Sequence, residues 1–331
     1  MSKILVTGAA GFIGYHVTQR LLEAGHRVVG LDAVTDYYDP GLKRARISRL
    51  TCQEAFGLVE DRLETPGRLE RLFAAEGFDA VIHLAAQAGV RYSLEDPRSY
   101  VSSNVAGTLE LLEAARRTPP KHLLMASTSS VYGLNEQMPY AEDHKADAQA
   151  SLYAATKKAN EAMGHSYAHL FGLPTTLFRF FTVYGPWGRP DMALFKFTRA
   201  MLAGEPIDIY NHGKMMRDFT YIDDIAAAIV ALVDVPPQEG LAGQAGHISP
   251  APYRVVNIGN QEPVKLMDFV EALERVLGTT AKKNFMPMQA GDVPATWADT
   301  SLLQELTGIT PQTSIEDGVA AFVDWYRAHY G

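Results

Sequence analysis

The segment Gly8-Ala9-Ala10-Gly11-Phe12-Ile13-Gly14 decides the fold class. It follows the apolar run Lys3–Thr7, which predicts a buried strand, and it opens the stretch Phe12–Ala24, which predicts a helix. Glycines here let the backbone turn tightly and approach a pyrophosphate, while the helix N-terminus offers unpaired N–H groups and a positive dipole. We therefore expect a dinucleotide site rather than a tight turn without a ligand, with contacts from Gly8, Gly11, Phe12, Ile13 and Gly14.

Strand and helix patterns alternate from this segment to about residue 185. Such alternation of apolar strands with helices is typical of a parallel sheet covered on both faces. The first half therefore predicts an α/β fold with a Rossmann-type doubly wound parallel sheet. The expected strands are Lys3–Thr7, Arg27–Asp32, Gly57–Glu60, Ala80–Leu84, His122–Ser127 and Thr175–Phe181, and the expected helices are Phe12–Ala24, Pro97–Arg117 and Ser151–Phe171.

The pattern after residue 185 is irregular and predicts a smaller, mixed α/β C-terminal lobe. We expect residues 1–185 to form mainly the cofactor domain and residues 186–331 mainly the substrate lobe, with some interchange of chain between them. Pro236–Pro252, rich in Gly, Pro and Gln, predicts a surface loop. The expected elements are strands Pro206–Tyr210 and Arg254–Ile258 and helices Met192–Ala203, Asp223–Val233, Leu266–Leu277 and Ile315–His329.

Composition excludes several classes of protein. The 331 residues carry a formal net charge of −8, which argues against nucleic acid as a partner. The longest apolar run, Ile225–Val233, is far shorter than the roughly 20 residues of a membrane span. A single cysteine, Cys52, excludes a disulfide framework and is expected to be buried. His165 and His169 are four residues apart, but without a third ligand they predict packing or surface positions and no metal site. A core strand beginning at residue 3 leaves no room for a signal peptide, so we expect a cytoplasmic protein.

Three further segments belong to the predicted dinucleotide site. Asp32 ends the second strand 18 residues after Gly14, where an acid binds the ribose hydroxyls and repels a 2′-phosphate. This favours NAD over NADP. Asp61 follows the third strand and is expected to bind the adenine amino group, although a solvated loop acid is an equal alternative. The end of the fourth strand, at the ligand-binding edge of the sheet, supplies Leu84, Ala85, Ala86 and Gln87.

Tyr153 and Lys157 are the candidate proton-transfer pair. They are four residues apart on a predicted helix, so both side chains lie on one face. A free tyrosine, with a pKa of about 10, is a poor base, but a nearby ammonium and the positive nicotinamide of NAD⁺ would lower that pKa. The hydroxyl-rich segment Ser127–Gly133 lies upstream at a strand end and suits a sugar-like ligand.

Together these motifs resemble the extended short-chain dehydrogenase/reductase family, in its nucleotide-sugar epimerase and dehydratase branch, over residues 3 to 327. The resemblance implies a bound NAD and catalysis by Tyr153, Lys157 and Thr128. It places Asn104 behind the nicotinamide and Arg217 on the diphosphate of the substrate. Asp292, in Gly291-Asp292-Val293-Pro294, matches a uridine-side motif, and Tyr210 is expected in the same substrate site.

The two residues after the catalytic threonine narrow the reaction. Sugar-nucleotide 4,6-dehydratases carry an Asp-Glu pair there and UDP-glucuronate decarboxylases typically a Glu, whereas this chain has Ser129 and Ser130. The segment 179–193 is similar to the UDP-glucuronate 4-epimerases. That similarity implies a C6 carboxylate held by Ser129, Ser130 and Thr182, with charge from Arg91 or Arg189, a choice the sequence leaves open. The alternatives are UDP-glucuronate decarboxylation, UDP-hexose 4-epimerisation or a redox-sensing binding protein.

The predicted helices also indicate an oligomer. The apolar faces of Val101–Ala115 and Ala155–Leu170 exceed what one chain is expected to bury. In the family that the chain resembles, the equivalent helices pair two subunits, so we expect a homodimer joined by a four-helix bundle.

Overall fold

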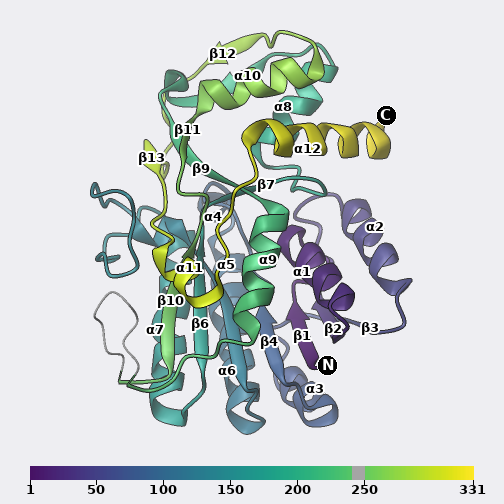
Figure 1. Ribbon diagram of the computed structural model, residues 1–331, viewed down its shortest axis with the longest axis vertical. Helices are drawn as coiled ribbons and strands as arrows, with labels where there is room; N and C mark the ends of the chain where they lie inside the picture. Colours follow the sequence, from purple (N-terminus) through teal and green to yellow (C-terminus); the bar gives the residue numbers. More distant parts are fainter. Residues whose placement is uncertain (241–249) are drawn as a thin grey trace.

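The computed structural model describes residues 1–240 and 250–331. Within these residues the centre of the molecule is a seven-stranded sheet whose neighbouring strands are all parallel, in the order β10-β6-β5-β4-β1-β2-β3 (Figure 1). The chain starts in the middle, moves to one edge, and then continues from β4 to the other edge. The strands are β1 Lys3–Thr7, β2 Arg27–Asp32, β3 Phe56–Glu60, β4 Ala80–His83, β5 His122–Thr128, β6 Thr175–Phe180 and β10 Tyr253–Ile258.

Alternating side chains of the strands build a core on each face of this sheet. On β1, Ile4 and Val6 belong to one cluster and Leu5 to the other, because successive side chains point to opposite faces. Helices α1, α9 and α11 cover the first face, and α3, α6 and α7 cover the second, while α2 packs beside α1 and β3. Their bounds are α1 Phe12–Glu23, α2 Pro40–Thr51, α3 Arg68–Glu76, α6 Gly107–Arg117, α7 Leu152–Phe171, α9 Ile222–Val233 and α11 Ser301–Thr307.

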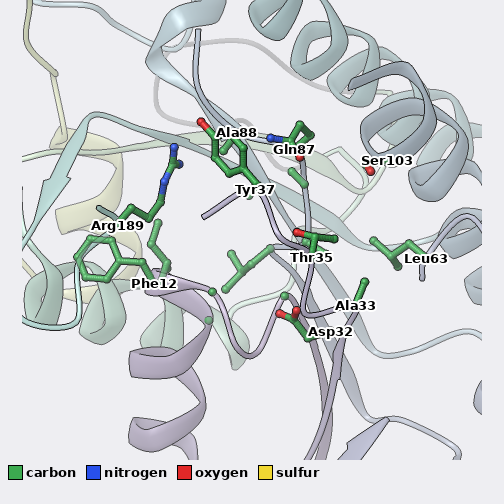
Figure 2. Close-up of a pocket in the computed structure, with 18 of the residues that line it drawn as sticks. Phe12, Asp32, Ala33, Thr35, Tyr37, Leu63, Gln87, Ala88, Ser103 and Arg189 are labelled. Carbon is green, nitrogen blue, oxygen red and sulfur yellow. The ribbon is translucent and has the colours of Figure 1, made fainter. Parts of the chain in front are cut away.

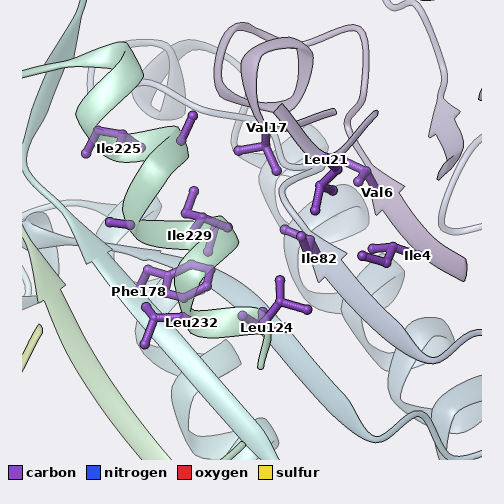
Figure 3. Packing of buried hydrophobic residues seen from close by; sticks show 14 of the residues in the cluster. Ile4, Val6, Val17, Leu21, Ile82, Leu124, Phe178, Ile225, Ile229 and Leu232 are labelled. Atoms are coloured by element: carbon purple, nitrogen blue, oxygen red, sulfur yellow. The ribbon is translucent and has the colours of Figure 1, made fainter. Parts of the chain in front are cut away.

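Helix α9 accounts for the longest apolar run of the chain. Figure 3 shows its Ile225, Ile229 and Leu232 packed beside Val17 and Leu21 of α1 and over the central strands. All five side chains are fully buried, and each contributes roughly 1.5–3 kcal/mol by leaving water. Among the described residues no helix is long and apolar enough to cross a membrane.

A smaller lobe lies beyond the carboxyl edge of the large sheet (Figure 1). Its core centres on Phe219 and Phe269, whose rings stack with centroids 4.2 Å apart. Among the described residues it contains a four-stranded sheet, in which β9 pairs with β7, β11 and β13, and a pair formed by β8 and β12. The elements are β7 Thr182–Tyr184, α8 Ala193–Leu202, β8 Ile207–Ile209, the 3₁₀ turn η3 Tyr210–Gly213, β9 Met216–Tyr221, β11 Pro263–Lys265, α10 Leu266–Leu277, β12 Lys283–Phe285, β13 Ala295–Thr296 and α12 Ile315–Tyr330.

The doubly wound parallel sheet and the mixed smaller lobe confirm the predicted fold class. Strand β10 and helices α9 and α11 follow residue 185 in the chain and yet pack on the large sheet. The assignment of residues 1–185 and 186–331 to two domains stays a prediction. The predicted loop Pro236–Pro252 falls largely on residues 241–249, which lie outside the described residues.

One predicted helix has an unexpected local feature, and one local prediction was wrong. The expected helix Pro97–Arg117 is helical throughout, but a π-helical turn η1 (Val101–Ala106) separates α5 (Pro97–Tyr100) from α6, and a short helix α4 (Tyr92–Glu95) precedes it. A π turn accommodates one additional residue, and here the buried Asn104 lies within it. Cys52 is exposed rather than buried, because it caps the C-terminus of the surface helix α2, where its thiol donates to the Ser48 carbonyl.

Candidate active site

Two adjoining pockets lie at the carboxyl edge of the large sheet, where β1 has β2 on one side and β4 on the other. This reversal of strand order opens a crevice in which α/β proteins bind ligands. The first pocket is lined by the glycine segment and by the ends of β2, β3 and β4, and Figure 2 shows part of its lining. It contains the predicted cofactor residues Gly8, Gly11, Phe12, Ile13, Gly14, Asp32, Asp61, Leu84, Ala85, Ala86, Gln87, Tyr153 and Lys157.

The glycine segment is folded so tightly that side chains would not fit. A Cβ added to Gly8 would lie 2.7 Å from the Ala85 backbone nitrogen, and one added to Gly14 would lie 2.0 Å from the Gly8 carbonyl oxygen. Gly8 also has a φ of +74°, a conformation that favours glycine. Gly11 precedes α1, and no described side chain caps this helix N-terminus. The helix therefore presents its N–H groups and its positive dipole to the pocket, as a pyrophosphate requires.

The far end of this pocket is acidic and carries a lysine that the sequence analysis missed. The Asp32 carboxylate, at the end of β2, accepts hydrogen bonds from the backbone N–H groups of Ala10 (2.9 Å) and Val34 (2.8 Å). Lys43 lines the same pocket and donates to the Thr35 carbonyl at 2.6 Å. Burial lowers the Lys43 pKa, against the opposing charge of Asp32. Lys43 lies eleven residues beyond Asp32 in α2, outside any motif we recognised.

Two predicted cofactor residues have protein partners that were not anticipated. The Asp61 carboxylate lines the pocket and also forms an ion pair with Arg68 at 2.8 Å. Asn104 is fully buried and lies outside the lining of both pockets. Its amide accepts from the Gln87 N–H (2.8 Å) and donates to the Gln87 carbonyl (3.0 Å) and to the Thr156 hydroxyl (3.0 Å). Asn104 thus ties the loop after β4 to the helix that carries Tyr153.

Tyr153 and Lys157 lie one turn apart at the start of α7, where Ser151 caps the helix by accepting from the Ala154 N–H at 3.2 Å. The Lys157 ammonium is buried and donates to the Ala126 carbonyl at 2.8 Å. Burial lowers the Lys157 pKa to about 8, against the opposing charge of Glu161. Lys157 is thereby fixed at the end of β5, inside the first pocket.

The Tyr153 phenol has a positive neighbour that the sequence did not predict. Burial raises its pKa, and the opposing contributions come from the charge of Arg189 and from a hydrogen bond with Thr128. The guanidinium of Arg189 is therefore a second cation, besides the predicted Lys157, that favours the phenolate. Thr128 ends β5 and begins the 3₁₀ turn η2 (Ser129–Tyr132), where its hydroxyl accepts from the Ser130 N–H at 3.2 Å.

A buried ion pair behind this pair was also missed. Glu161 follows Lys157 by one helical turn, and both of its carboxylate oxygens accept from Arg179 of β6 at 2.9 Å. The Ser127 hydroxyl donates to the same carboxylate at 2.7 Å, and Ser127 lines the first pocket, whereas Ser129 and Ser130 line the second. The pair joins α7, β5 and β6 directly beneath the catalytic residues.

The second pocket extends from Tyr153 into the smaller lobe. The two pockets are continuous, because Tyr37, Thr128, Tyr153, Phe181, Arg189 and Met192 line both. The second pocket brings together every residue predicted to bind the substrate: Arg91, Thr128, Ser129, Ser130, Thr182, Arg189, Tyr210, Arg217 and Asp292.

Arg91 and Arg217 lie together in one part of the second pocket, and Arg189 lies in another. Arg91 forms an ion pair with Asp292 at 3.2 Å and stacks on Tyr210, with the guanidinium carbon 4.7 Å from the ring centroid. Arg217 donates to the Val293 carbonyl at 2.7 Å, next to this group. Arg189, in contrast, lies at the junction of the pockets beside Tyr153. The structure thus separates the two arginines that the sequence analysis could not distinguish.

The two histidines of α7, His165 and His169, pack against neighbouring rings. His165 packs edge-on against Tyr253, with ring centroids 5.0 Å apart, and stacks on His169. In the part of the chain that the structure describes, no three His, Cys, Asp or Glu side chains are grouped as a metal site would need.

Comparisons with known proteins agree with this geometry. The chain is 53% identical to a probable UDP-glucuronate 4-epimerase of Rhizobium meliloti (strain 1021), over 99% of this chain and 98% of the relative. It is 49% identical to UDP-glucuronate 4-epimerase 4 of Arabidopsis thaliana, over 99% of this chain and 76% of the relative. A crystal structure of the Bacillus cereus UDP-glucuronic acid 4-epimerase with UDP-glucuronic acid and NAD superposes with a TM-score of 0.90 at 36% identity, covering 99% and 100% of the two chains.

A match to a family model assigns the chain to a broader family. Residues 4–259 match the NAD dependent epimerase/dehydratase family, and this range contains the glycine segment, Tyr153 and Lys157. The protein therefore belongs to the NAD dependent epimerase/dehydratase family.

Proposed function

We propose that this protein is an NAD-dependent UDP-glucuronate 4-epimerase, which interconverts UDP-glucuronate and UDP-galacturonate through a transient 4-keto sugar. The observation that carries this proposal is the set of groups around the junction of the two pockets. Hydroxyls of Ser129, Ser130 and Thr182 and the guanidinium of Arg189 surround the space beside Tyr153, without the acid that dehydration requires after the catalytic threonine. The full-length similarity to proteins named UDP-glucuronate 4-epimerase supports the same substrate.

The proton of the C4 hydroxyl is taken by Tyr153. Thr128 hydrogen-bonds the phenol and is positioned to bind the C4 oxygen as well. Arg189 favours the phenolate electrostatically, and Lys157 lies one turn away to hold the nicotinamide ribose. A base that recovers its proton within the same cycle needs no exchange with solvent, which fits a half-buried Tyr153 beside a buried Lys157.

The hydride needs a resident carrier rather than a second substrate. The tight glycine segment, the uncapped N-terminus of α1 and the Asp32 carboxylate fit NAD. When bound, NAD accepts the hydride from C4 and later returns it to the opposite face of the same carbon. For this return, the 4-keto sugar must turn over while its UDP remains anchored. We assign the anchor to Arg217, Arg91, Tyr210 and Asp292 at the far end of the second pocket.

The intermediate poses a problem of selectivity, because a 4-keto glucuronate is a β-keto acid and loses CO₂ when the C5–carboxylate bond aligns with the carbonyl π system. We propose that Ser129, Ser130 and Thr182 donate hydrogen bonds to the carboxylate and hold it out of that alignment. Arg189 supplies the positive charge. Charge-assisted hydrogen bonds of this kind are stronger than neutral ones and fix orientation.

The first prediction concerns Tyr153→Phe. Loss of the phenolic base should lower kcat for UDP-galacturonate formation from UDP-glucuronate by roughly a thousandfold. Nuclear magnetic resonance of the product mixture measures this, with Tyr330→Phe, a tyrosine outside both pockets, as the matched control. Formation of a UDP-pentose and CO₂ by the unaltered protein would instead assign it as a decarboxylase, and activity on uncharged UDP-hexoses alone would assign it as a hexose epimerase.

The second prediction concerns Thr182→Val, which removes a hydroxyl with little change of volume. If Thr182 holds the carboxylate, this variant should release CO₂ and a 4-keto-pentose alongside UDP-galacturonate, whereas the exposed Thr51→Val should not. Trapping of ¹⁴CO₂ from substrate labelled at C6 measures the partition. An unchanged CO₂ yield would show that Thr182 has no such role.

We also propose that two copies of the chain form a homodimer through α6 and α7. These helices pack side by side on one face of the sheet (Figure 1). They leave Leu109 (43% exposed), Leu170 (65%) and Phe171 (46%) uncovered, and Val101 of the preceding π turn is 50% exposed. Exposed apolar side chains on two adjacent helices support an interface here, and two helices from each copy would make a four-helix bundle.

The third prediction tests this interface. Leu170→Glu should place a charge in the bundle and convert a dimer to a monomer at micromolar concentration, because an unpaired buried charge is costly. Light scattering after size-exclusion chromatography measures the mass. Leu134→Glu changes an equally exposed leucine, 67% exposed, away from these helices and should remain dimeric. A monomeric parent protein would contradict the proposed dimer.

A further inference from the structure

Three side chains from two distant loops meet over the junction of the two pockets. Arg189 and Asp191 follow β7, whereas Tyr37 follows β2, in the loop that also carries Thr35 and Ala33 of the cofactor pocket. We call these three residues, Tyr37, Arg189 and Asp191, the Arg189 clasp. Figure 2 shows Tyr37 and Arg189 side by side, with the phenolic oxygen turned toward the guanidinium.

The contacts within the clasp fix the Arg189 guanidinium in one orientation. Its Nε donates to one Asp191 carboxylate oxygen at 3.0 Å, and its Nη2 donates to the other at 2.5 Å. The Tyr37 hydroxyl donates to the same Asp191 carboxylate at 3.3 Å, across 154 residues of sequence. The Tyr37 ring also lies beside the guanidinium, with its centroid 5.9 Å from the Arg189 Cζ.

The backbone makes room for this arrangement at Gly89. A Cβ at Gly89 would lie 2.9 Å from the Tyr37 hydroxyl and 3.6 Å from the Arg189 Nη2. The φ of Gly89 is +103°, a backbone conformation that residues other than glycine rarely adopt. The Tyr100 hydroxyl donates to the Gly89 carbonyl at 2.5 Å and to the Ala88 carbonyl at 3.0 Å, so the loop is held in this shape. The loop at Gly89 thus leaves the space that the Tyr37 and Arg189 side chains occupy.

The three groups of the clasp have complementary charges. Burial lowers the Arg189 pKa, but the Asp191 charge, the hydrogen bonds to Asp191 and the nearby Tyr37 and Tyr38 together outweigh burial, and the pKa is raised overall. Burial raises the Asp191 pKa, but Arg189 outweighs it and the pKa is lowered overall. Burial and the nearby Asp191 charge raise the Tyr37 pKa to about 12, so Tyr37 stays a phenol that donates. At neutral pH Arg189 is therefore positively charged, Asp191 is negatively charged and Tyr37 is a neutral phenol.

The geometry points to Asp191 and Tyr37 as positioning residues that set the preference of this protein for a sugar carboxylated at C6. This inference rests on the proposed function, in which Arg189 faces that carboxylate. Arg189 has five N–H donors and uses two of them on Asp191. Among the described residues none accepts from its Nη1, so the outer edge of the guanidinium remains for the ligand. Holding a long, flexible side chain beforehand reduces the entropy lost when the substrate binds.

A purely structural clasp, which merely joined the two loops, would behave differently. It would affect every UDP-sugar equally, because UDP is bound at the far end of the pocket by other residues. Positioning of Arg189 instead affects only ligands that carry the carboxylate. UDP-glucuronate and UDP-glucose differ only at C6, in a carboxylate and a hydroxymethyl group, so the ratio of their dissociation constants separates the two roles.

The experiment measures both dissociation constants by calorimetry with NAD-loaded protein in the Tyr153→Phe background, in which conversion of the ligands is expected to be roughly a thousandfold slower. Asp191→Asn should weaken UDP-glucuronate binding by roughly tenfold or more, as expected for a charge-assisted hydrogen bond, and leave UDP-glucose within about twofold. Tyr37→Phe removes a weaker contact and should shift the ratio by about threefold in the same direction. Asp36→Asn, an exposed acid next to Tyr37, is the matched control and should shift neither.

A double-mutant cycle shows whether Asp191 acts through Arg189. With Arg189→Gln present, adding Asp191→Asn should change the ratio no further. An additive loss, an unchanged ratio in Asp191→Asn, or an equal loss for both ligands would overturn the clasp. These outcomes leave the proposed function standing if the parent protein forms UDP-galacturonate. A parent protein that prefers neither ligand and forms no UDP-galacturonate would instead overturn the proposed function.

Discussion

The parallel pairing of β1 with both β2 and β4 is the constraint on which the rest of the structure depends. Because all three strands run the same way, their carboxyl ends meet at one edge of the sheet. Thr7, Asp32 and His83 end these strands, and the chain must turn sharply after β1 to enter α1. Only a glycine at position 8 fits this turn, since a Cβ there would lie 2.7 Å from the Ala85 backbone after β4. The same close approach leaves the narrow, N–H-lined space that a pyrophosphate needs.

The catalytic residues are placed by this edge and by α7, and their chemistry depends on the groups that surround them. Tyr153 and Lys157 alone are compatible with any dehydrogenase of the family. Hydroxyls at positions 129 and 130, in place of carboxylic acids, and Arg189 beside the phenol make the site suitable for an anionic sugar that is oxidised and reduced at one carbon. In the proposed function, reactivity and selectivity therefore come from different segments: α7 would supply the base, while the loops after β2, β5 and β7 would surround the carboxylate.

Much of the fold could be predicted from the sequence, because periodicity is a local property. The strand at Lys3–Thr7, the glycine segment and the four-residue spacing of Tyr153 and Lys157 each carry their information within a few residues. The π turn around Asn104 was not predicted, because it depends on the loop after β4 that this side chain holds. The contact of Tyr37 with Asp191 spans 154 residues and follows no motif, and the choice between Arg91 and Arg189 required their positions in space. Cys52 was misplaced because composition alone favours burial of cysteine.

In the proposed reaction, C4 of the sugar is oxidised and then reduced with the same hydride. Conversion of UDP-glucuronate carrying deuterium at C4 tests this directly, with the product analysed by mass spectrometry and nuclear magnetic resonance. If the same hydride returns, the UDP-galacturonate formed retains the deuterium in full at C4, in inverted configuration, with no uptake of solvent hydrogen at that carbon. Loss of the label to water, or to NAD released from the protein, would contradict it.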